Sequence, residues 1–371
     1  MVNEDPWHFE RPELAGRVLD ALTKGPATAL TLFAPRRTGK TEFLLKDLAP
    51  LARHERVRIV YVSFWRASLS PLALLLHALE SALAGGTWTD RIRRGARALA
   101  PKLTLSAPVG GSAEIDLTAI GPTPPTELLL YLDDLLERLA RRSGTVILLL
   151  DEVQELAKDA RNAPLVASLR TSLDTRSDTL KAVFTGSSRD GLRAMFSERE
   201  APFFHFATPL ELPPLESPFV AHLLRVGKRH TGRDIDEGEA IAAFGKLHRN
   251  PYFFRRLLET LLLEPEIDVA AGVAIVRARL SEELRYPETW LELDVVQRGV
   301  IHALAEGREK PYGRAARARV ATLAGIDEPS AAAVQSALRT LVRRGLVDSW
   351  SGRWEIEDPA FAEWIRGEGR H

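Results

Sequence analysis

Short apolar runs alternate along this chain with stretches in which apolar positions recur every three or four residues. Five runs predict strands of a sheet: TALTLF at 28–33, RIVYVSF at 58–64, TVILLLDE at 145–152, LKAVFTG at 180–186 and ATPLELPPL at 207–215. The third is apolar throughout, which is typical of a parallel strand covered on both faces. Helical periodicity follows the first two strands, as in GKTEFLLKDLAPLA. The alternation predicts an α/β domain built on a parallel sheet.

The segment 91–125 interrupts this alternation between the second and third strands. It begins with a cluster of arginines and continues as KLTLSAPV and SAEIDLTAI on either side of Gly110-Gly111, a pattern that predicts a β-hairpin. Two interpretations stay open. The hairpin is either a decorating insertion or an arm that touches a partner or DNA.

The pattern turns helical after about residue 216. From residue 290 three helices precede DSWSGRWEI, which alternates about Ser351-Gly352 and predicts the hairpin of a winged-helix domain. We therefore expect an ATPase-type α/β core at 1–215, a helical lid at 216–288 and a winged-helix domain at 289–371. The tryptophans of the last part are expected to pack the wing and final helix, with base stacking as the alternative; these are Trp350, Trp354 and Trp364.

Composition narrows the class of protein. The 371 residues are 45% hydrophobic, carry 50 basic and 50 acidic side chains, and include no cysteine. The balanced charge does not advertise a nucleic-acid or membrane partner, and the missing cysteines exclude disulfides and thiolate metal sites. No N-terminal signal segment is evident, and no apolar run reaches the ~20 residues of a membrane span. We expect a cytoplasmic protein with no membrane partner.

The stretch APRRTGKTE at 34–42 resembles a phosphate-binding loop. It follows a predicted strand and opens a predicted helix, so its backbone N–H groups and the helix N-terminus would face an anion. Lys40 would reach the β- and γ-phosphates of ATP, the Thr41 hydroxyl would ligate Mg²⁺, and Gly39 would allow close backbone approach. The alternative is a chance string on a turn. The residues expected to contact ATP or ADP here are Ala34, Pro35, Arg36, Arg37, Thr38, Gly39, Lys40, Thr41 and Glu42.

Ala34 departs from the pattern G-x-x-x-x-G-K-[ST], which begins with glycine. If this position requires a positive φ, alanine costs about 1 kcal/mol, a tolerable strain. Losing Lys40 would be far worse, because it would remove the charge that faces the phosphates.

A second motif, VILLLDEVQEL, places Asp151 and Glu152 at the end of an apolar strand. Ligands of open α/β sheets bind at that end of the strands. Asp151 would hold Mg²⁺ through water, and Glu152 would orient the attacking water as a catalytic residue. The alternative is that both acids cap the following helix. Ser187 and Ser188, after the fourth strand, are candidates for contacting the γ-phosphate or the water, with a plain turn as the alternative; Ser187 is assigned to the catalytic set.

These motifs together resemble the archaeal-type P-loop ATPases of the STAND/AAA+ group, which carry a C-terminal winged helix and include the origin-recognition ATPases. The resemblance spans most of the chain. It rests on FERPELAGRV, APRRTGKTEFL, VILLLDEVQEL, FTGSSRDGLRAMF with PLELPPL, HRNPYFFRRLLE and GLVDSWSGRWEIEDPAFAEWI, in that order. It implies ATP-dependent switching or assembly, with the lid and winged helix moving as the nucleotide changes.

The resemblance adds further site residues. It implies nucleotide contacts by Arg11, in the N-terminal motif, and by Pro251, in the lid motif, where Arg249 replaces glycine. It also implies a homo-oligomer in which a neighbour's arginine completes the site. The candidates for that arginine are Arg189, Arg193 and Arg199, of which Arg199 is our preference.

The predicted third helix of the winged domain, PSAAAVQSALRTLVRRG, has an apolar face and a basic face. Arg339 and Arg343, with Arg344 beside the wing, would neutralise phosphates of duplex DNA without reading sequence. A protein partner is the alternative. The sequence thus predicts a Mg²⁺-dependent ATPase switch coupled to DNA or a protein. A noncatalytic adaptor that keeps the nucleotide fold is the rival hypothesis, and a ligand sensor ranks last.

Overall fold

The computed structural model describes residues 5–65, 70–84, 102–106, 112–116, 125–186, 189–196, 201, 203–308, 310–349 and 353–367. Its centre is a five-stranded parallel sheet in the order β2-β5-β6-β1-β7. The strands are β1 (Ala29–Phe33), β2 (Arg58–Ser63), β5 (Val146–Asp151), β6 (Leu180–Gly186) and β7 (Thr208–Glu211). All five predicted strands are present, which confirms the α/β parallel sheet.

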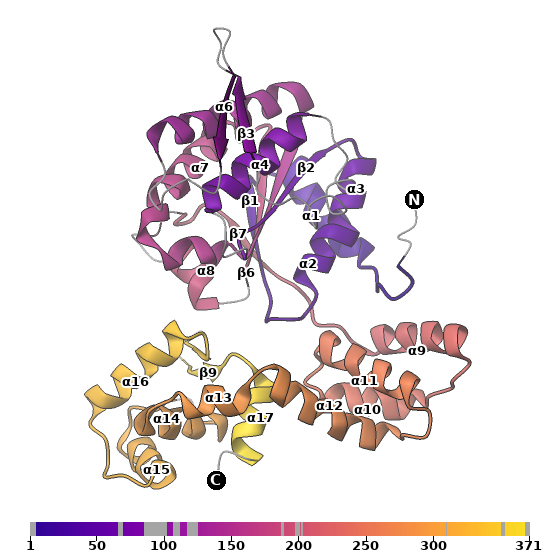
Figure 1. Ribbon diagram of the computed structural model, residues 1–371, viewed down its shortest axis with the longest axis vertical. Coiled ribbons are helices and arrows are strands. Elements are labelled where there is room, and N and C mark those ends of the chain that lie inside the picture. The colour runs from indigo at the N-terminus through magenta and orange to yellow at the C-terminus, as the bar shows by residue number, and fades with distance from the viewer. Residues whose placement is uncertain are drawn as a thin grey trace.

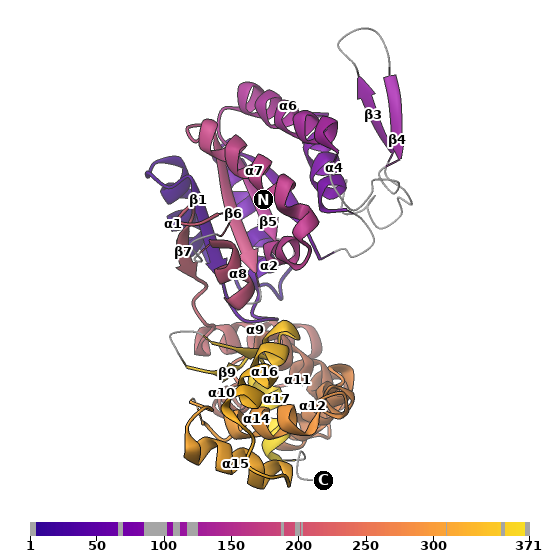
Figure 2. The same cartoon turned by 90° about the vertical axis from the view of Figure 1, so that its left-hand side faces the viewer.

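Helices cover both faces of this sheet (Figures 1 and 2). They are α1 (Pro12–Thr23), α2 (Lys40–Glu42), the π-helix η1 (Phe43–Leu48), α3 (Ala49–His54), α4 (Pro71–Leu83), α6 (Thr126–Ser143), η3 (Val153–Lys158), η4 (Ala160–Asn162), α7 (Ala163–Thr175) and α8 (Arg189–Phe196). Successive side chains of the apolar strand β5 point alternately into two hydrophobic cores. Leu148 and Leu150 join the cluster beneath α4, α6 and α7, whereas Ile147 and Leu149 join the cluster beneath α1 and η1.

The inserted segment contains the predicted hairpin. β3 (Lys102–Ser106) pairs antiparallel with β4 (Ser112–Asp116). Figures 1 and 2 show it projecting from the α/β part on the side away from the C-terminal helices. The rest of the 91–125 segment up to residue 124 lies outside the described residues.

Four helices follow the sheet and enclose an aromatic core of their own. They are α9 (Ser217–Thr231), α10 (Glu237–Lys246), α11 (Pro251–Leu263) and α12 (Val269–Glu283). Phe219, Phe244 and Phe254 meet at its centre with ring centroids 5.3 to 6.0 Å apart. We call this part the lid, and its core also includes Trp7 and Phe9 from the N-terminus.

The remaining elements form a C-terminal unit around a further apolar cluster. They are α13 (Tyr286–Leu291), α14 (Val295–Ala305), α15 (Arg314–Ala324), α16 (Ala331–Arg343), β8 (Val347–Asp348), β9 (Glu355–Ile356) and α17 (Pro359–Gly367). After α13, three helices (α14 to α16), an antiparallel strand pair and a closing helix follow one another. Trp354 and Trp364 pack against this cluster, in agreement with the expected packing role, and Trp350 lies outside the described residues.

The lid and the C-terminal unit lie at the edge of the sheet where the parallel strands end (Figure 1). Among the described residues, no helix combines the length and apolar character needed to cross a membrane.

Candidate functional site

The 34–41 loop leaves β1 and turns sharply into α2. Its left-handed residues are Arg37, with φ 62°, and Gly39, with φ 93°; Ala34 is not among the residues with positive φ. The strain that we considered for Ala34 is therefore absent, because that position does not need glycine's freedom. The loop instead places Arg37 in the left-handed region, at a cost of about 1 kcal/mol.

Lys40 folds back inside this loop. Its Nζ donates to the carbonyl oxygens of Ala34, at 2.6 Å, and Pro35, at 2.8 Å. The Thr38 hydroxyl donates to the same Pro35 oxygen at 2.7 Å. Burial lowers the pKa of Lys40 to about 8, although the charges of Glu152, Asp151 and Glu357 oppose the shift. An entering phosphate would therefore exchange two carbonyl partners of this ammonium for anionic ones.

Asp151, at the end of β5, accepts hydrogen bonds from three hydroxyl groups. Its Oδ2 accepts from Thr41 Oγ1 at 2.8 Å and from the Tyr61 hydroxyl at 2.9 Å, and its Oδ1 accepts from Thr185 Oγ1. The predicted pair Thr41 and Asp151 is thus brought together. Tyr61 and Thr185 were missed, although each stands near the end of a predicted strand that neighbours β5 in the sheet.

Glu152 follows in a left-handed conformation, with φ 56°. Its side chain makes no capping hydrogen bond to η3, so the interpretation of this acid as a helix cap is not supported. It accepts instead from Nε2 of Gln154 and lines both cavities at the loop. The Glu152 carboxylate therefore borders the space beside Lys40 and Thr41.

Two cavities flank the start of α2. One, of about 250 Å³, is lined by Arg37, Gly39, Lys40, Thr41, Glu42, Glu152, Pro251, Tyr252 and Arg255. The other, of about 370 Å³, is lined by Arg36, Arg37, Thr41, Tyr61, Ser63, Trp65, Asp151 and Glu152. Trp65 is 57% exposed, and the Arg36 guanidinium carbon lies 5.7 Å from its ring centroid. Both cavities mix cations, carboxylates and hydroxyls, as a site for a metal-bound anion requires.

The predicted lid motif reaches the first of these cavities. Pro251 lines it as the first residue of α11, whose N-terminus is capped by Asn250 through bonds from the backbone of Tyr252 and Phe253. Arg249 has a φ of 51°, the region that favours glycine, so the backbone here has a conformation that the glycine of the resembled lid motif would suit. Arg249 itself pairs with Glu216 at 3.1 Å.

Residues 5–11 form a strap between the loop helix and the lid. Arg11 donates from Nη1 to the Pro213 carbonyl at 3.1 Å and from Nη2 to the Thr38 carbonyl at 3.4 Å. Its backbone N–H donates to Asp47, which also contacts the buried ring of His8. Arg11 thus lies beside the predicted loop, and its contact with a nucleotide stays a prediction.

Arg255 of α11 ties the lid to the strap and the loop helix. It donates to the Trp7 carbonyl at 3.0 Å and pairs with Glu42 at 3.3 Å. Sequence reasoning missed Arg255, because HRNPYFFRRLLE offers adjacent arginines and no signal for which one faces the site. Tyr252 was also missed; the guanidinium carbon of Arg37 lies 5.5 Å from the centroid of its ring.

Other predicted residues lie elsewhere. Ser187, Ser188 and Arg199 lie outside the described residues, whereas Arg189 and Arg193 belong to α8. Arg339 and Arg343 are exposed on α16. Arg344 differs from them: its Nη2 pairs with Glu292 at 2.5 Å, and it lines a cavity shared with the α/β core.

Comparison with known proteins adds the fold class. No protein-family model matches the sequence, and no curated protein matches it. Among solved structures, a Walker-type ATPase of Pyrococcus abyssi aligns at 18% identity with a TM-score of 0.64, covering 96% of this chain and 95% of the other. The ADP form of the ORC2 protein of Aeropyrum pernix aligns at 16% identity with a TM-score of 0.55, covering 96% and 91%. The chain therefore has the P-loop NTPase fold that these archaeal proteins share.

Proposed function

We propose that this protein is a Mg²⁺-dependent ATPase that works as a nucleotide-controlled switch. The observation that carries the proposal is the 2.8 Å contact between Thr41 and Asp151, formed beside the ammonium of Lys40. A hydroxyl and a carboxylate at the end of a parallel strand, next to a loop lysine, are the groups that a Mg²⁺-bound triphosphate requires. The fold shared with a Walker-type ATPase and with a protein solved with ADP supports it.

Each residue would have a distinct role. The 34–41 loop and Lys40 would bind the β- and γ-phosphates, with Thr41 as a direct Mg²⁺ ligand and Asp151 holding the ion through water. Bound Mg²⁺ supplies charge neutralisation at the phosphates. Glu152 would orient the attacking water. Arg11 of the strap and Pro251 of the lid would contact the nucleotide. Hydrolysis by one chain would be slow, since an arginine from a neighbouring subunit would have to stabilise the transition state.

The C-terminal unit would be a winged-helix domain that carries the partner. Arg339 and Arg343 are exposed on the polar face of α16, opposite the buried Val334, Leu338 and Leu341. Two arginines on one helix face fit nonspecific contact with the phosphates of duplex DNA. A protein surface is the alternative partner for the same face.

ATP turnover by the purified protein, with and without duplex DNA and with Lys40→Ala as the blank, tests the proposal. We expect turnover that the substitution abolishes, and stimulation by DNA if the C-terminal unit couples to it.

One observation favours a noncatalytic adaptor as second candidate: the ammonium of Lys40 already donates hydrogen bonds to two carbonyls of its own loop. Tight ADP binding without turnover under any partner condition would favour the adaptor. Absence of any binding or thermal stabilisation by Mg-ATP would refute both.

A further inference from the structure

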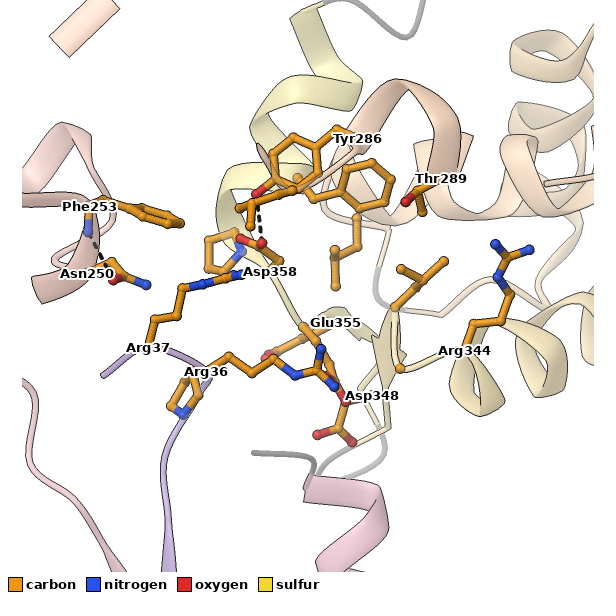
Figure 3. Close-up of a pocket in the computed structure, with 18 of the residues that line it drawn as sticks. Arg36, Arg37, Asn250, Phe253, Tyr286, Thr289, Arg344, Asp348, Glu355 and Asp358 are labelled. Atoms are coloured by element: carbon orange, nitrogen blue, oxygen red, sulfur yellow. Dashed lines mark hydrogen bonds between the residues drawn. The ribbon is translucent and has the colours of Figure 1, made fainter. Parts of the chain in front are cut away.

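A third cavity, of about 420 Å³, lies between the 34–41 loop, the lid and the C-terminal unit. Acidic side chains of the C-terminal unit meet basic side chains of the loop here (Figure 3). The acids lie on β8, β9 and the turn into α17: Asp348, Glu355, Glu357 and Asp358. We call these four residues the acidic edge.

Arg36 extends from the loop toward the acidic edge. Figure 3 shows its guanidinium directed at Asp348 and Glu355. Gly345 follows α16 in the left-handed conformation, and a Cβ built there would lie 3.9 Å from both Nη2 of Arg36 and Oε2 of Glu357. The Arg36 guanidinium and the Glu357 carboxylate therefore lie beside the same backbone position of the C-terminal unit.

Arg37 lies on the other side of the same cavity and points toward Asp358 (Figure 3). Asp358 is held in place, since it accepts from the Tyr286 hydroxyl at 2.7 Å and from the Ala360 backbone at 3.0 Å. Burial and Asp358 raise the pKa of Tyr286, and the charge of Arg37 opposes this shift. Arg37 is thus close enough to act electrostatically on this pair.

The same two arginines also line the cavities beside Thr41 and Asp151. They therefore stand between two places where negative charge can lie: the acidic edge on one side and the phosphates of a bound nucleotide on the other. Glu357 is a member of the acidic edge and also acts on the phosphate-binding loop, because its negative charge raises the pKa of Lys40. An arginine that turns to a phosphate gives up part of its interaction with the acidic edge.

We propose that the acidic edge is an autoinhibitory latch, which occupies the loop arginines in place of a nucleotide's phosphates and is released when a triphosphate binds. The inference rests on the proposed function and deepens it, by naming what the nucleotide displaces. Binding would free β8, β9 and α17 from the loop and let the C-terminal unit move. The latch thereby couples the phosphate site to the part of the chain that carries the exposed arginines of α16.

Glu355→Gln/Glu357→Gln tests the latch, because it removes two charges of the acidic edge and leaves the buried Asp348 and the α17 turn intact. The matched control is Glu306→Gln/Glu328→Gln, which removes two acids of the same unit that pair with Arg319 and Arg317. Calorimetry with Mg-ADP and with a nonhydrolysable Mg-ATP analogue gives the affinities. Thermal unfolding verifies that both variants fold.

We expect the latch variant to bind the triphosphate analogue roughly fivefold or more tightly than wild type, the change that removal of two partly exposed charges near the loop arginines permits. The control should match wild type. Hydrogen exchange at residues 345–348 and 355–358 of wild type should rise when the analogue binds. Equal affinities for wild type and both variants would overturn the latch and leave the proposed function standing. No binding by any of the three would overturn the proposed function, and the latch with it.

Discussion

The hydroxyl of Thr41 and the carboxylate of Asp151 lie 2.8 Å apart, although 110 residues separate them in the chain. One stands at the start of α2 and the other at the end of β5, and the parallel sheet brings both to the same edge. Because neither residue is placed by its sequence neighbours, the pair depends on the whole core being folded. Its chemistry can be tested directly.

Asp151→Asn should uncouple nucleotide binding from Mg²⁺. The asparagine side chain can still accept a hydrogen bond from the Thr41 hydroxyl, so the fold should persist. Loss of the negative charge should lower the affinity for Mg²⁺ about 10- to 100-fold, as it does for residues that orient a metal's ligands. Thermal shift with ADP across a Mg²⁺ titration measures this. Asp174→Asn on α7, an exposed acid paired with Arg170, is the control. An unchanged Mg²⁺ midpoint would exclude Asp151 from the metal site.

Glu152→Gln should separate binding from hydrolysis. The amide cannot take up a proton from the attacking water, so turnover should fall about 10²- to 10⁴-fold while nucleotide affinity stays near wild type. Single-turnover hydrolysis and calorimetry on the same preparation give both values. Glu155→Gln, which alters an acid of η3 paired with Lys158, should keep full turnover. Turnover retained by Glu152→Gln would assign the water to another residue.

The buried ammonium of Lys40 predicts a pH dependence of nucleotide binding. Its pKa is lowered to about 8 in the free protein, and a bound polyphosphate would raise it by favouring the charged form. Affinity should therefore fall as pH rises through about 8, by at most about tenfold per pH unit. Calorimetry from about pH 7 to 9.5 gives the slope. Lys40→Arg, which stays charged throughout this range, should bind with little pH dependence, and equal slopes would place the titration elsewhere.

The lowered pKa of Lys40 affects folding stability in the opposite direction from nucleotide affinity: stability should rise with pH where affinity falls. Between about pH 8 and 10.5 the unfolded chain holds a proton at Lys40 that the folded chain has released. The free energy of unfolding should therefore gain a contribution as pH rises through this window. Lys40→Met should lack that gain in denaturant titrations.

Arg339→Ala/Arg343→Ala should weaken duplex DNA binding uniformly across sequences. If each arginine neutralises one phosphate, the slope of log K against log salt should fall by about 1.8. Fluorescence anisotropy with two unrelated duplexes at several salt concentrations measures it. Lys24→Ala, at the end of α1, removes an exposed lysine from the α/β core and should leave the slope unchanged. If wild type binds no duplex, the basic face of α16 is free for the alternative, a protein partner.

Leu148→Ala should destabilise the protein by about 2 to 5 kcal/mol, because Leu148 is fully buried in the central strand β5. Leu130→Ala on α6 removes the same atoms from a side chain that is 68% exposed, and should change the free energy of unfolding by less than about 0.5 kcal/mol. Urea denaturation compares them. Similar losses for both substitutions would contradict the assignment of β5 to the centre of the sheet.

The sequence predicted the sheet well because its signal is local. An uninterrupted apolar run such as TVILLL must be buried on both faces, and each β-strand end carries its own polar residues. Strand order is a different kind of information. No local pattern indicates that β6 lies between β1 and β5, and the hydroxyl of Thr185, which this order brings onto Asp151, was therefore missed.

The features of the site that the sequence did not reveal have a common physical origin. Ala34 was examined for strain because the motif has glycine there, but the loop's positive φ falls on Arg37 and Gly39. Arg36 and Arg37 were assigned to nucleotide, while the structure also directs them to the acidic edge, a surface made by residues more than 300 positions later. Contacts between parts that are remote in sequence leave no periodicity in either part.

The strap of residues 5–11 has a consequence for the order of assembly during synthesis. Pro6 is bonded by His222, 216 positions later, and Trp7 by Arg255, 248 positions later. At about 5 to 20 residues per second, these partners leave the ribosome roughly 10 to 50 seconds after the strap does. Residues 5–11 therefore remain without these partners until the lid has been made. The candidate site is thereby bordered by residues that precede the sheet and residues that follow it, and a chain that stopped after β7 would have the sheet without Pro251, Tyr252 and Arg255, which line the cavity beside Lys40.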